Sequence, residues 1–264
     1  MPKIQITLTP AESKRLIAKA VAALPEVRSA MRSGTIVVGV GTTNACVAEE
    51  LLGKRVDKSR FVAGVVLPKG TCVVQKEKRM REIIILNGKA ANISMDEALE
   101  RMGEGDVVIK GANALDSKGT AGVLLASRSG GTIGKVMGPV KSKGITLVIP
   151  VGLEKFIPGS VREISRAAGI SKFSYATGCP TGLMPVSGRV VTELEAVKVL
   201  TGAKAAAMGK GGVSGAEGSV TLLVEGTSAQ LSKAKRLIKM VKGEPQVRIE
   251  TSCVDCGQPD CFRR

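Results

Sequence analysis

The stretch Val37–Leu52, VVGVGTTNACVAEELL, decides the fold when it is read beside Asp106–Thr120, DVVIKGANALDSKGT. The first stretch has a short apolar run, then glycines and hydroxyl residues, then a helix-forming segment, an order typical of a buried strand, a loop and a helix. The second is another apolar strand followed by polar and charged residues. Side chains at the carboxyl ends of strands line one crevice in an open α/β sheet. The two stretches therefore predict a shared cleft.

The loop in the first stretch predicts an anion-binding site. Its residues are Gly39, Gly41, Thr42, Thr43 and Asn44. A glycine-rich loop that opens a helix turns successive backbone N–H groups toward one point, and the helix dipole adds to the attraction for phosphate or carboxylate. The alternative is a tight strand–helix turn that needs glycine only for its backbone geometry.

The second stretch supplies candidate catalytic groups at the edge of the same cleft. Lys110, Asp116 and Lys118 are expected to clamp the anion and to supply acid–base groups, and Lys pairs with phosphate as a point charge. The alternative is that these charged residues follow a strand end and reach solvent. Cys46, near the start of the expected helix, is either an activated thiol or a small buried residue.

Composition limits the classes of function. Of 264 residues, 44% are apolar and 2% aromatic, with 32 glycines, which fits a buried parallel sheet with close helix packing. The net charge of +16 favours anionic partners. Nucleic acid is not the expected partner, because aromatic platforms for base stacking are nearly absent. The chain has no histidine, which excludes Ser-His-Asp triads and imidazole acid–base chemistry.

No signal-like apolar segment follows Met1, and the longest apolar runs are too short to span a bilayer. We therefore expect no membrane association and a cytoplasmic location. Thiols stay reduced in that compartment.

The order of predicted elements indicates an α/β protein in two domains. Strands alternate with helices in residues 1–178, which predicts a Rossmann-like, mainly parallel sheet. In this part a helix is expected to begin near Thr120. Residues 179–251 show the order strand, helix, strand, strand, helix, strand, a ferredoxin-like unit whose last strand is expected at Gln246–Glu250. Residues 252–264 form a cysteine-rich tail.

Residues 33 to 250 resemble a known superfamily on three short motifs. Gly39-Val40-Gly41-Thr42-Thr43-Asn44 is similar to its phosphate loop, and Gly111-Ala112-Asn113 and Lys118-Gly119-Thr120 match a later strand end and the step after it. The superfamily includes ribose-5-phosphate isomerase, CoA transferases, sugar-responsive transcription regulators and the translation initiation factor 2B subunits. The resemblance implies a phosphosugar ligand that also contacts Gly111 and Asn113, isomerase-like chemistry, and a homo-oligomer.

Departures from the family pattern leave the reaction open. Lys110 and Asn113 stand where the isomerases carry acidic residues, and Asn113 cannot act as the base that aldose–ketose isomerisation needs. Asp116 is then the candidate base. A non-catalytic ligand sensor or interaction protein fits the loss of acidic residues equally well. A CoA transferase ranks last, because only Glu77 and Glu154 are loose candidates for its nucleophile.

The tail predicts a metal site. Cys253, Cys256 and Cys261 lie within nine residues, and a Cys-x-x-Cys-Gly turn lets two thiolates face one ion. Zinc or an iron–sulfur cluster requires four ligands, and we expect Cys179 to be the fourth. Asp260, Cys72 or a partner chain are the alternatives for that ligand, and a tail with free or redox-active thiols is the alternative to metal. A bound metal is expected to be structural.

Overall fold

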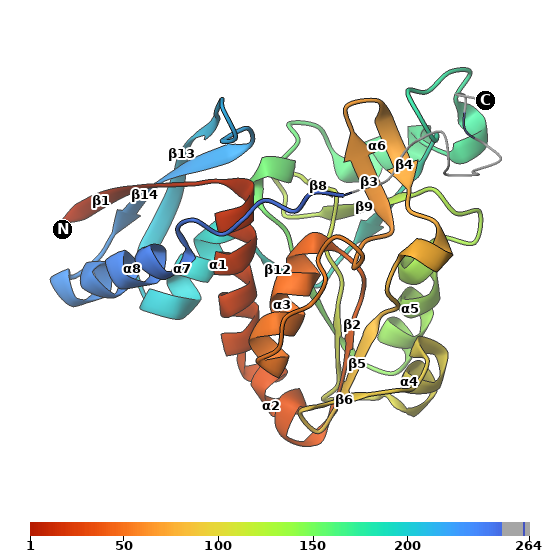
Figure 1. The fold of residues 1–264 in the computed structure, drawn as a ribbon, viewed down its shortest axis with the longest axis horizontal. Coiled ribbons are helices and arrows are strands. Elements are labelled where there is room, and N and C mark those ends of the chain that lie inside the picture. The colour runs from red at the N-terminus through yellow and green to blue at the C-terminus, as the bar shows by residue number, and fades with distance from the viewer. Residues whose placement is uncertain (250–260, 262–264) are drawn as a thin grey trace.

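The computed structural model describes residues 1–249 and residue 261 (Figure 1). A six-stranded sheet forms the larger part of the molecule, in the order β12-β10-β7-β2-β5-β6. Its strands are β2 (Thr35–Val38), β5 (Ile83–Leu86), β6 (Lys89–Ala91), β7 (Val107–Ile109), β10 (Thr146–Pro150) and β12 (Arg189–Val191). The first four strands in this order run parallel, whereas β5 and β6 pair antiparallel. The α/β class is confirmed, and the sheet is mixed.

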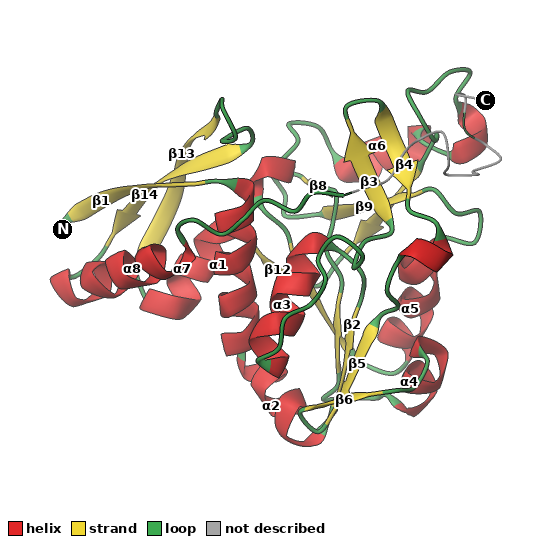
Figure 2. Ribbon diagram, in the orientation of Figure 1, coloured by secondary structure: helices red, strands yellow, loops and turns green. Residues whose placement is uncertain are grey.

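Helices cover both faces of this sheet (Figure 2). α1 (Pro10–Ala23), α2 (Pro25–Ser33) and α3 (Thr42–Leu52) lie on one side, and α4 (Met95–Arg101) and α5 (Gly131–Ser142) on the other. A capping box begins α1: Thr9 N donates to Glu12 Oε2 at 2.9 Å, and Glu12 N donates back to Thr9 Oγ1 at 3.4 Å. This local signal, readable in the sequence, sets where the helix begins.

A second sheet lies beside the first, in the order β1-β14-β13. Its strands are β1 (Lys3–Leu8), β13 (Lys204–Gly211) and β14 (Ser219–Glu225). Helices α7 (Glu193–Thr201) and α8 (Ser228–Val241) accompany these strands. The N-terminal strand β1 pairs antiparallel with β14, from Lys3 opposite Glu225 to Leu8 opposite Val220. Its Ile6 and Leu8 enter an apolar cluster that also holds Leu222 of β14 and Val37 of β2.

The second sheet differs from the expected four-stranded unit. β12, its expected first strand, instead extends the larger sheet by pairing parallel with β10. Residues 246–249 form no strand, so the strand expected at Gln246–Glu250 is wrong for the residues that the structure describes. β1 contributes the third strand from the other end of the chain. Pairing between distant segments of chain decides this arrangement, and local sequence signals do not report such pairing.

A third, antiparallel sheet contains β8 (Ala114–Leu115), β9 (Ala121–Leu125) and β11 (Gly182–Val186). The helix expected to begin near Thr120 is wrong, because β9 pairs with both neighbours there. Gly119, with φ of +75°, makes the tight turn from β8 into β9. The remaining elements are the hairpin β3 (Gly64–Leu67) and β4 (Gly70–Val73), helix α6 (Val161–Ala167), and 3-10 turns at Lys76–Lys78, Leu153–Lys155 and Ile170–Lys172. None of the helices in the described part of the chain has the length and apolarity needed to cross a membrane.

Candidate functional site

The four parallel strands all end at one edge of the larger sheet, and we call the residues that follow them the carboxyl edge. These residues are Gly39–Asn44 after β2, Lys110–Ala112 after β7, Val151–Lys155 after β10 and Thr192–Glu193 after β12. The parallel pairing of β2 with β7 confirms that the two stretches read from the sequence end side by side. Gly39 N donates to Ile109 O at 2.9 Å, and Val151 N donates to Val191 O at 3.0 Å, so backbone bonds tie the edge together.

The loop into α3 is held by its own polar groups. Gly41 N donates to Phe61 O at 2.8 Å, which takes this amide away from any ligand. Asn44 is fully buried, and its Nδ2 donates to Gly39 O at 2.6 Å and to Ile109 O at 3.3 Å. The Asn44 side chain therefore fixes the loop against β7. Its Oδ1 is buried and has no hydrogen-bond donor among the described residues.

The N-terminus of α3 presents backbone N–H donors at the carboxyl edge. The N-cap residue, Gly41, has no side chain to accept a hydrogen bond, and the N–H groups of the first helical turn have no acceptor within the helix. This turn begins at Thr42, which is partly exposed, whereas Thr43 is buried. The positive end of the helix dipole thus lies at the carboxyl edge.

Lys110 lies across the same loop. A Cβ built on Gly39 would lie 2.9 Å from Lys110 Cδ, so the close approach of this side chain depends on glycine at that position. Lys110 Nζ donates to Gly111 O at 3.3 Å. Burial lowers the pKa of Lys110 to about 8, repulsion from Lys155 adds to this effect, and the Glu82 carboxylate opposes it.

Lys155 and Glu193 complete the charged groups of the carboxyl edge. Burial lowers the pKa of Lys155, although attraction to Glu154 opposes this, and Glu154 Oε1 lies 4.0 Å from Lys155 Nζ. Burial raises the pKa of Glu193, whose Oε2 accepts from Leu153 N at 2.9 Å. The sequence analysis missed Lys155 and Glu193 because neither belongs to a motif. Their positions just after two predicted strands were the available signal.

Asp116 has a different role from the expected one. Its Oδ1 accepts from Lys118 N at 3.0 Å and from Thr120 N at 2.9 Å, and its Oδ2 accepts from Val161 N at 3.1 Å. Burial raises the pKa of Asp116, but these backbone donors outweigh burial and hold the pKa below its ordinary value. The carboxylate therefore fixes the turn between β8 and β9 against the start of α6.

The other two residues of the second stretch also belong to this hairpin. Asn113 Oδ1 accepts from Leu124 N at 3.1 Å, and the Lys118 side chain is exposed at the turn. Within the described residues no hydrogen bond or ion pair joins Lys110 to Asp116 or Lys118. Of the three residues expected to form the clamp, Lys110 lies at the carboxyl edge near Lys155, whereas Asp116 and Lys118 lie at the hairpin turn.

We expect Asp116→Asn to lower the free energy of unfolding by about 2 kcal/mol, because an amide has only one oxygen for the three N–H donors and adds an N–H group that faces one of them. Urea unfolding at pH 7 measures this change. Asp96→Asn is the matched control: Asp96 pairs with Lys135 on the surface, where an ion pair contributes little. Equal stability of the two variants would contradict the hairpin role.

The same carboxylate gives stability a defined pH dependence. The pKa of Asp116 is lower in the folded protein than its ordinary value of 3.8. Its contribution is therefore complete above that ordinary value and is lost as the pH falls through the folded pKa. Acid titration of stability should show a smaller loss in Asp116→Asn than in the wild type.

The structure has a cavity of 220 Å³, and none of the residues that line it belongs to the carboxyl edge. It lies between the start of α1, Cys46 of α3, Lys58 and the segment Glu244–Val247 that follows α8. Lys14, which also faces this cavity, is close enough to Lys155 to lower the pKa of Lys155. The volume is small beside the roughly 300–1,000 Å³ of drug-sized ligand sites, so it suits a small metabolite.

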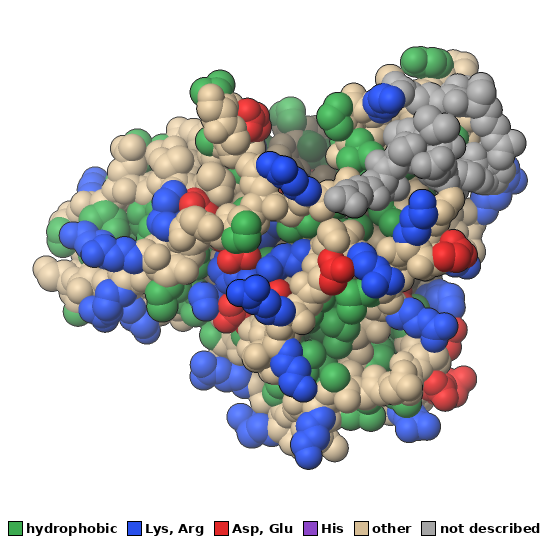
Figure 3. Space-filling model, viewed as in Figure 1, with side chains coloured by type: hydrophobic (Ala, Val, Ile, Leu, Met, Phe, Trp, Pro, Cys, Tyr) green, Lys and Arg blue, Asp and Glu red, His purple; other side chains and the backbone are tan. Residues whose placement is uncertain are grey.

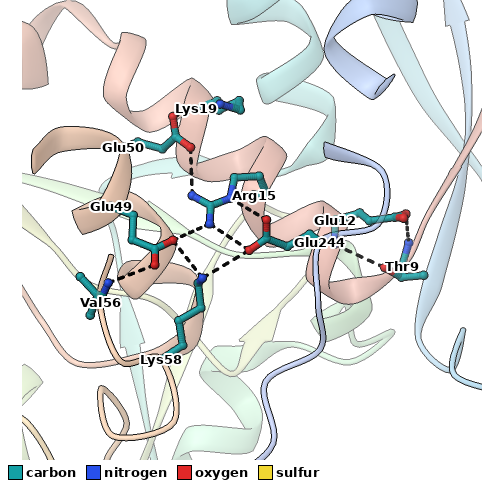
Figure 4. A network of polar contacts seen from close by, with 9 residues as sticks. All are labelled: Thr9, Glu12, Arg15, Lys19, Glu49, Glu50, Val56, Lys58 and Glu244. Carbon is teal, nitrogen blue, oxygen red and sulfur yellow. Dashed lines mark hydrogen bonds and ion pairs between the residues drawn. The ribbon is translucent and has the colours of Figure 1, made fainter. Parts of the chain in front are cut away.

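A partly buried ion network contributes Lys58 and Glu244 to the lining of this cavity. Figure 4 shows the contacts of this network. Arg15 pairs with Glu49, with Glu50 at 2.9 Å and with Glu244 at 2.9 Å, and its side chain is only 13% exposed. Lys58 pairs with Glu49 at 2.9 Å and with Glu244 at 3.4 Å. The network therefore joins α1, α3 and the segment after α8.

Cys46 lies beside this network. Its Sγ and carboxylate oxygens of Glu49 and Glu244 lie within 4.8 Å of one another, a spacing that a metal ion could use. Arg15 and Lys58 already neutralise both carboxylates. Burial raises the pKa of the Cys46 thiol to about 11, against the attraction of Arg15 and Lys58. The thiol thus stays protonated at neutral pH, as expected of a small buried residue rather than a nucleophile.

Comparison with protein-family models, with curated proteins and with solved structures finds no match for this chain. Function is therefore argued from the geometry of the carboxyl edge.

Proposed function

We propose that this protein binds a small phosphorylated or otherwise anionic metabolite at the carboxyl edge. The observation that carries the proposal is the pair Lys110 and Lys155. Both lysines are half-buried and have lowered pKa values. In the described residues, the ion pair that involves either of them is the one between Lys155 Nζ and Glu154 Oε1 at 4.0 Å. Buried charges in proteins are normally paired. An anion beside these lysines would supply an ion-pair partner for Lys110, which has none among the described residues.

Two neighbouring features support a ligand with both a phosphate and hydroxyl groups. The start of α3 offers backbone N–H donors and the positive end of a helix dipole, which suit a phosphate. The buried Asn44 Oδ1 needs a donor, and a ligand hydroxyl would supply one. A phosphosugar carries both groups. Gly111, whose Cβ position would lie 3.6 Å from this oxygen, leaves space beside it.

The same proposal includes a Rossmann-like assignment for the larger sheet and a ferredoxin-like assignment for the smaller part. A Rossmann-like sheet binds ligands outside the carboxyl ends of its parallel strands, which is where these groups lie. The second sheet, with α7 and α8, is the part that we compare with a ferredoxin-like domain. Basic side chains are spread over the visible face of the molecule (Figure 3), and this charge would draw anionic metabolites toward it.

A non-catalytic ligand sensor is the second candidate, and the placement of Asp116 favours it. All three hydrogen bonds of that carboxylate go to backbone N–H groups of the hairpin and α6, which supports a structural use of Asp116 over its use as the base of an isomerase. Isomerase-like chemistry would need another group. Lys110, with a pKa of about 8, exchanges its proton near neutral pH and is the best candidate.

Thermal unfolding with four added ligands tests the proposal. Ribose 5-phosphate and inorganic phosphate should raise the melting temperature at pH 7, ribose should not, and sodium chloride at matched ionic strength controls for general screening. Stabilisation by ribose 5-phosphate beyond that of phosphate would support the use of Asn44 Oδ1. No shift with any phosphate compound would overturn the proposal. Proton NMR of the same mixture distinguishes the two candidates, since an isomerase converts ribose 5-phosphate to its ketose and a sensor leaves it unchanged.

A further inference from the structure

Three cysteines that are far apart in the sequence meet in one buried cluster. Cys72 lies on β4, Cys179 lies in the turn before β11, and Cys261 lies near the C-terminus. They are 2%, 4% and 9% exposed, and Val65 and Leu67 of β3 pack against them. Half of the six cysteines of this chain therefore gather at one place, although 189 positions separate the first from the last (261 minus 72). We call this group the cysteine cluster.

The backbone holds two of these cysteines in a fixed relation. Thr71 N donates to Thr177 O at 3.0 Å, and Cys179 N donates to Thr71 O at 2.9 Å. The Thr71 hydroxyl also donates to Cys179 O. Gly178 has a φ of +95°, and a Cβ there would lie 2.1 Å from Thr71 O, so only glycine allows this approach. Backbone hydrogen bonds thus join β4 to the turn before β11, at Cys179 and at the residue next to Cys72.

We propose that the cysteine cluster binds a metal centre through thiolate ligands and fastens the C-terminal segment to the β3–β4 hairpin. Thiolates are soft ligands that select zinc or an iron–sulfur cluster, and four of them complete either centre. Cys72, Cys179 and Cys261 would be three of the four. The chain has no histidine, so the fourth ligand must be another cysteine or a carboxylate.

Two further cysteines lie close to Cys261 in the sequence. Cys253 and Cys256 come eight and five positions before it, in a Cys-x-x-Cys-Gly spacing typical of metal knuckles. Both lie outside the described residues. The proposal therefore rests on the three described thiols and uses the spacing as an independent observation. In this proposal Cys72 joins the site together with Cys179, whereas the sequence analysis offered Cys72 as an alternative to Cys179.

The cysteine cluster differs from the other candidate metal group. In the described residues, Cys46, Glu49 and Glu244 are the one trio whose ligand atoms all lie within 4.8 Å of one another. The three sulfur atoms of the cysteine cluster therefore do not all lie within 4.8 Å of one another. They would draw together on a zinc ion or surround a larger iron–sulfur cluster.

Elemental analysis of the full-length protein, purified without oxygen or added metal, tests this proposal. We expect about one zinc per chain, or about four irons with a broad absorption band in the visible. Cys72→Ser and Cys179→Ser should each lower the metal content at least fivefold. Cys46→Ser is the matched control, because it also removes a buried thiol but lies in another part of the fold. Metal-free protein, or full metal content in both cluster variants, would overturn the proposal.

Thiol labelling of the wild type keeps the test valid where a variant fails to fold. Peptide mass spectrometry after brief alkylation should find Cys72, Cys179 and Cys261 protected in the purified protein and labelled after treatment with a strong chelator under native conditions. Cys46 should stay unlabelled in both samples, since its burial does not depend on metal. Protection that survives the chelator, or disulfides joining the cluster cysteines in unreduced peptides, would contradict a metal centre.

Discussion

Lys110→Met is expected to weaken binding of ribose 5-phosphate by about ten- to a hundredfold. A hydrogen bond to a charged group contributes about 1.5–3 kcal/mol, and about 1.4 kcal/mol corresponds to a factor of ten in affinity. Methionine keeps the unbranched apolar stem that crosses Gly39, so the change removes the ammonium group with little loss of packing. Isothermal titration calorimetry at pH 7 and fixed ionic strength measures the dissociation constant.

Lys118→Met is the matched control for this variant. Both substitutions remove one positive charge, but Lys118 is exposed at the hairpin turn and is not joined to the carboxyl edge by any contact of the described residues. Its affinity should stay within about twofold of the wild type, since exposed charges are screened at physiological salt. Unchanged binding in Lys110→Met, or equal losses in the two variants, would show that the carboxyl edge does not hold the anion.

The pKa of Lys110 also predicts the pH dependence of binding. A bound anion favours the charged ammonium group, so affinity should be constant below a pH of about 8 and fall above it. In the ligand-free protein the unfolded chain, with a Lys pKa of 10.5, binds more protons between about 8 and 10.5. The stability contributed by this group therefore rises with pH across that window. Titrations at pH 7 and 9.5 check the fall in affinity, which should be smaller in Lys110→Met, where Lys155 alone titrates.

Arg15→Met should cause the largest loss of stability, about 3 kcal/mol. Removing one partner of a partly buried ion network leaves the other charges without compensation, and the partial exposure of these side chains places the loss at the low end of the range for buried pairs. Arg15 lies between Glu49, Glu50 and Glu244, and only Lys58 and Lys19 would remain to pair with these carboxylates. Urea unfolding followed by circular dichroism measures the change in the free energy of unfolding.

Two further variants distinguish the effect of breaking the ion network from the effect of removing one positive charge. Arg28→Met, on the exposed face of α2, should change stability by less than about 0.5 kcal/mol. Arg15→Lys keeps the charge but lacks the planar fork that contacts several carboxylates, so its loss should be intermediate. If Arg15→Met were as stable as Arg28→Met, the network would have no net role in holding the segment after α8 against α1 and α3.

Short-range signals in the sequence were enough to predict several elements. The capping box at Thr9 marks the start of α1, as its geometry confirms. The apolar runs at Val37 and Val107 predicted β2 and β7, and their common strand direction placed both ends at one edge. Each of these signals acts over a few residues, so no knowledge of distant segments was needed.

Long-range pairing decided the elements that were predicted wrongly. Ala121–Leu125 has a composition that suits a helix or a buried strand, and only its partners β8 and β11 make it a strand. β12 joins the larger sheet and β1 joins the second, because each finds an unpaired strand edge there. Strand partners are chosen by packing across the whole molecule, which the local pattern does not encode.

For the candidate site, too, the sequence predicted which residues lie there, and tertiary contacts decided what each one binds. The residues of the strand ends, Gly39 and Lys110 among them, could be named from the chain alone because a strand end follows from local periodicity. The partners of each side chain could not: Asp116 binds backbone N–H groups of its own hairpin and of α6, Lys155 comes near Lys110, and Cys72 meets Cys179 and Cys261. Local order sets which residues end a strand, but contacts between segments far apart in the chain set the charge, burial and chemistry of each side chain.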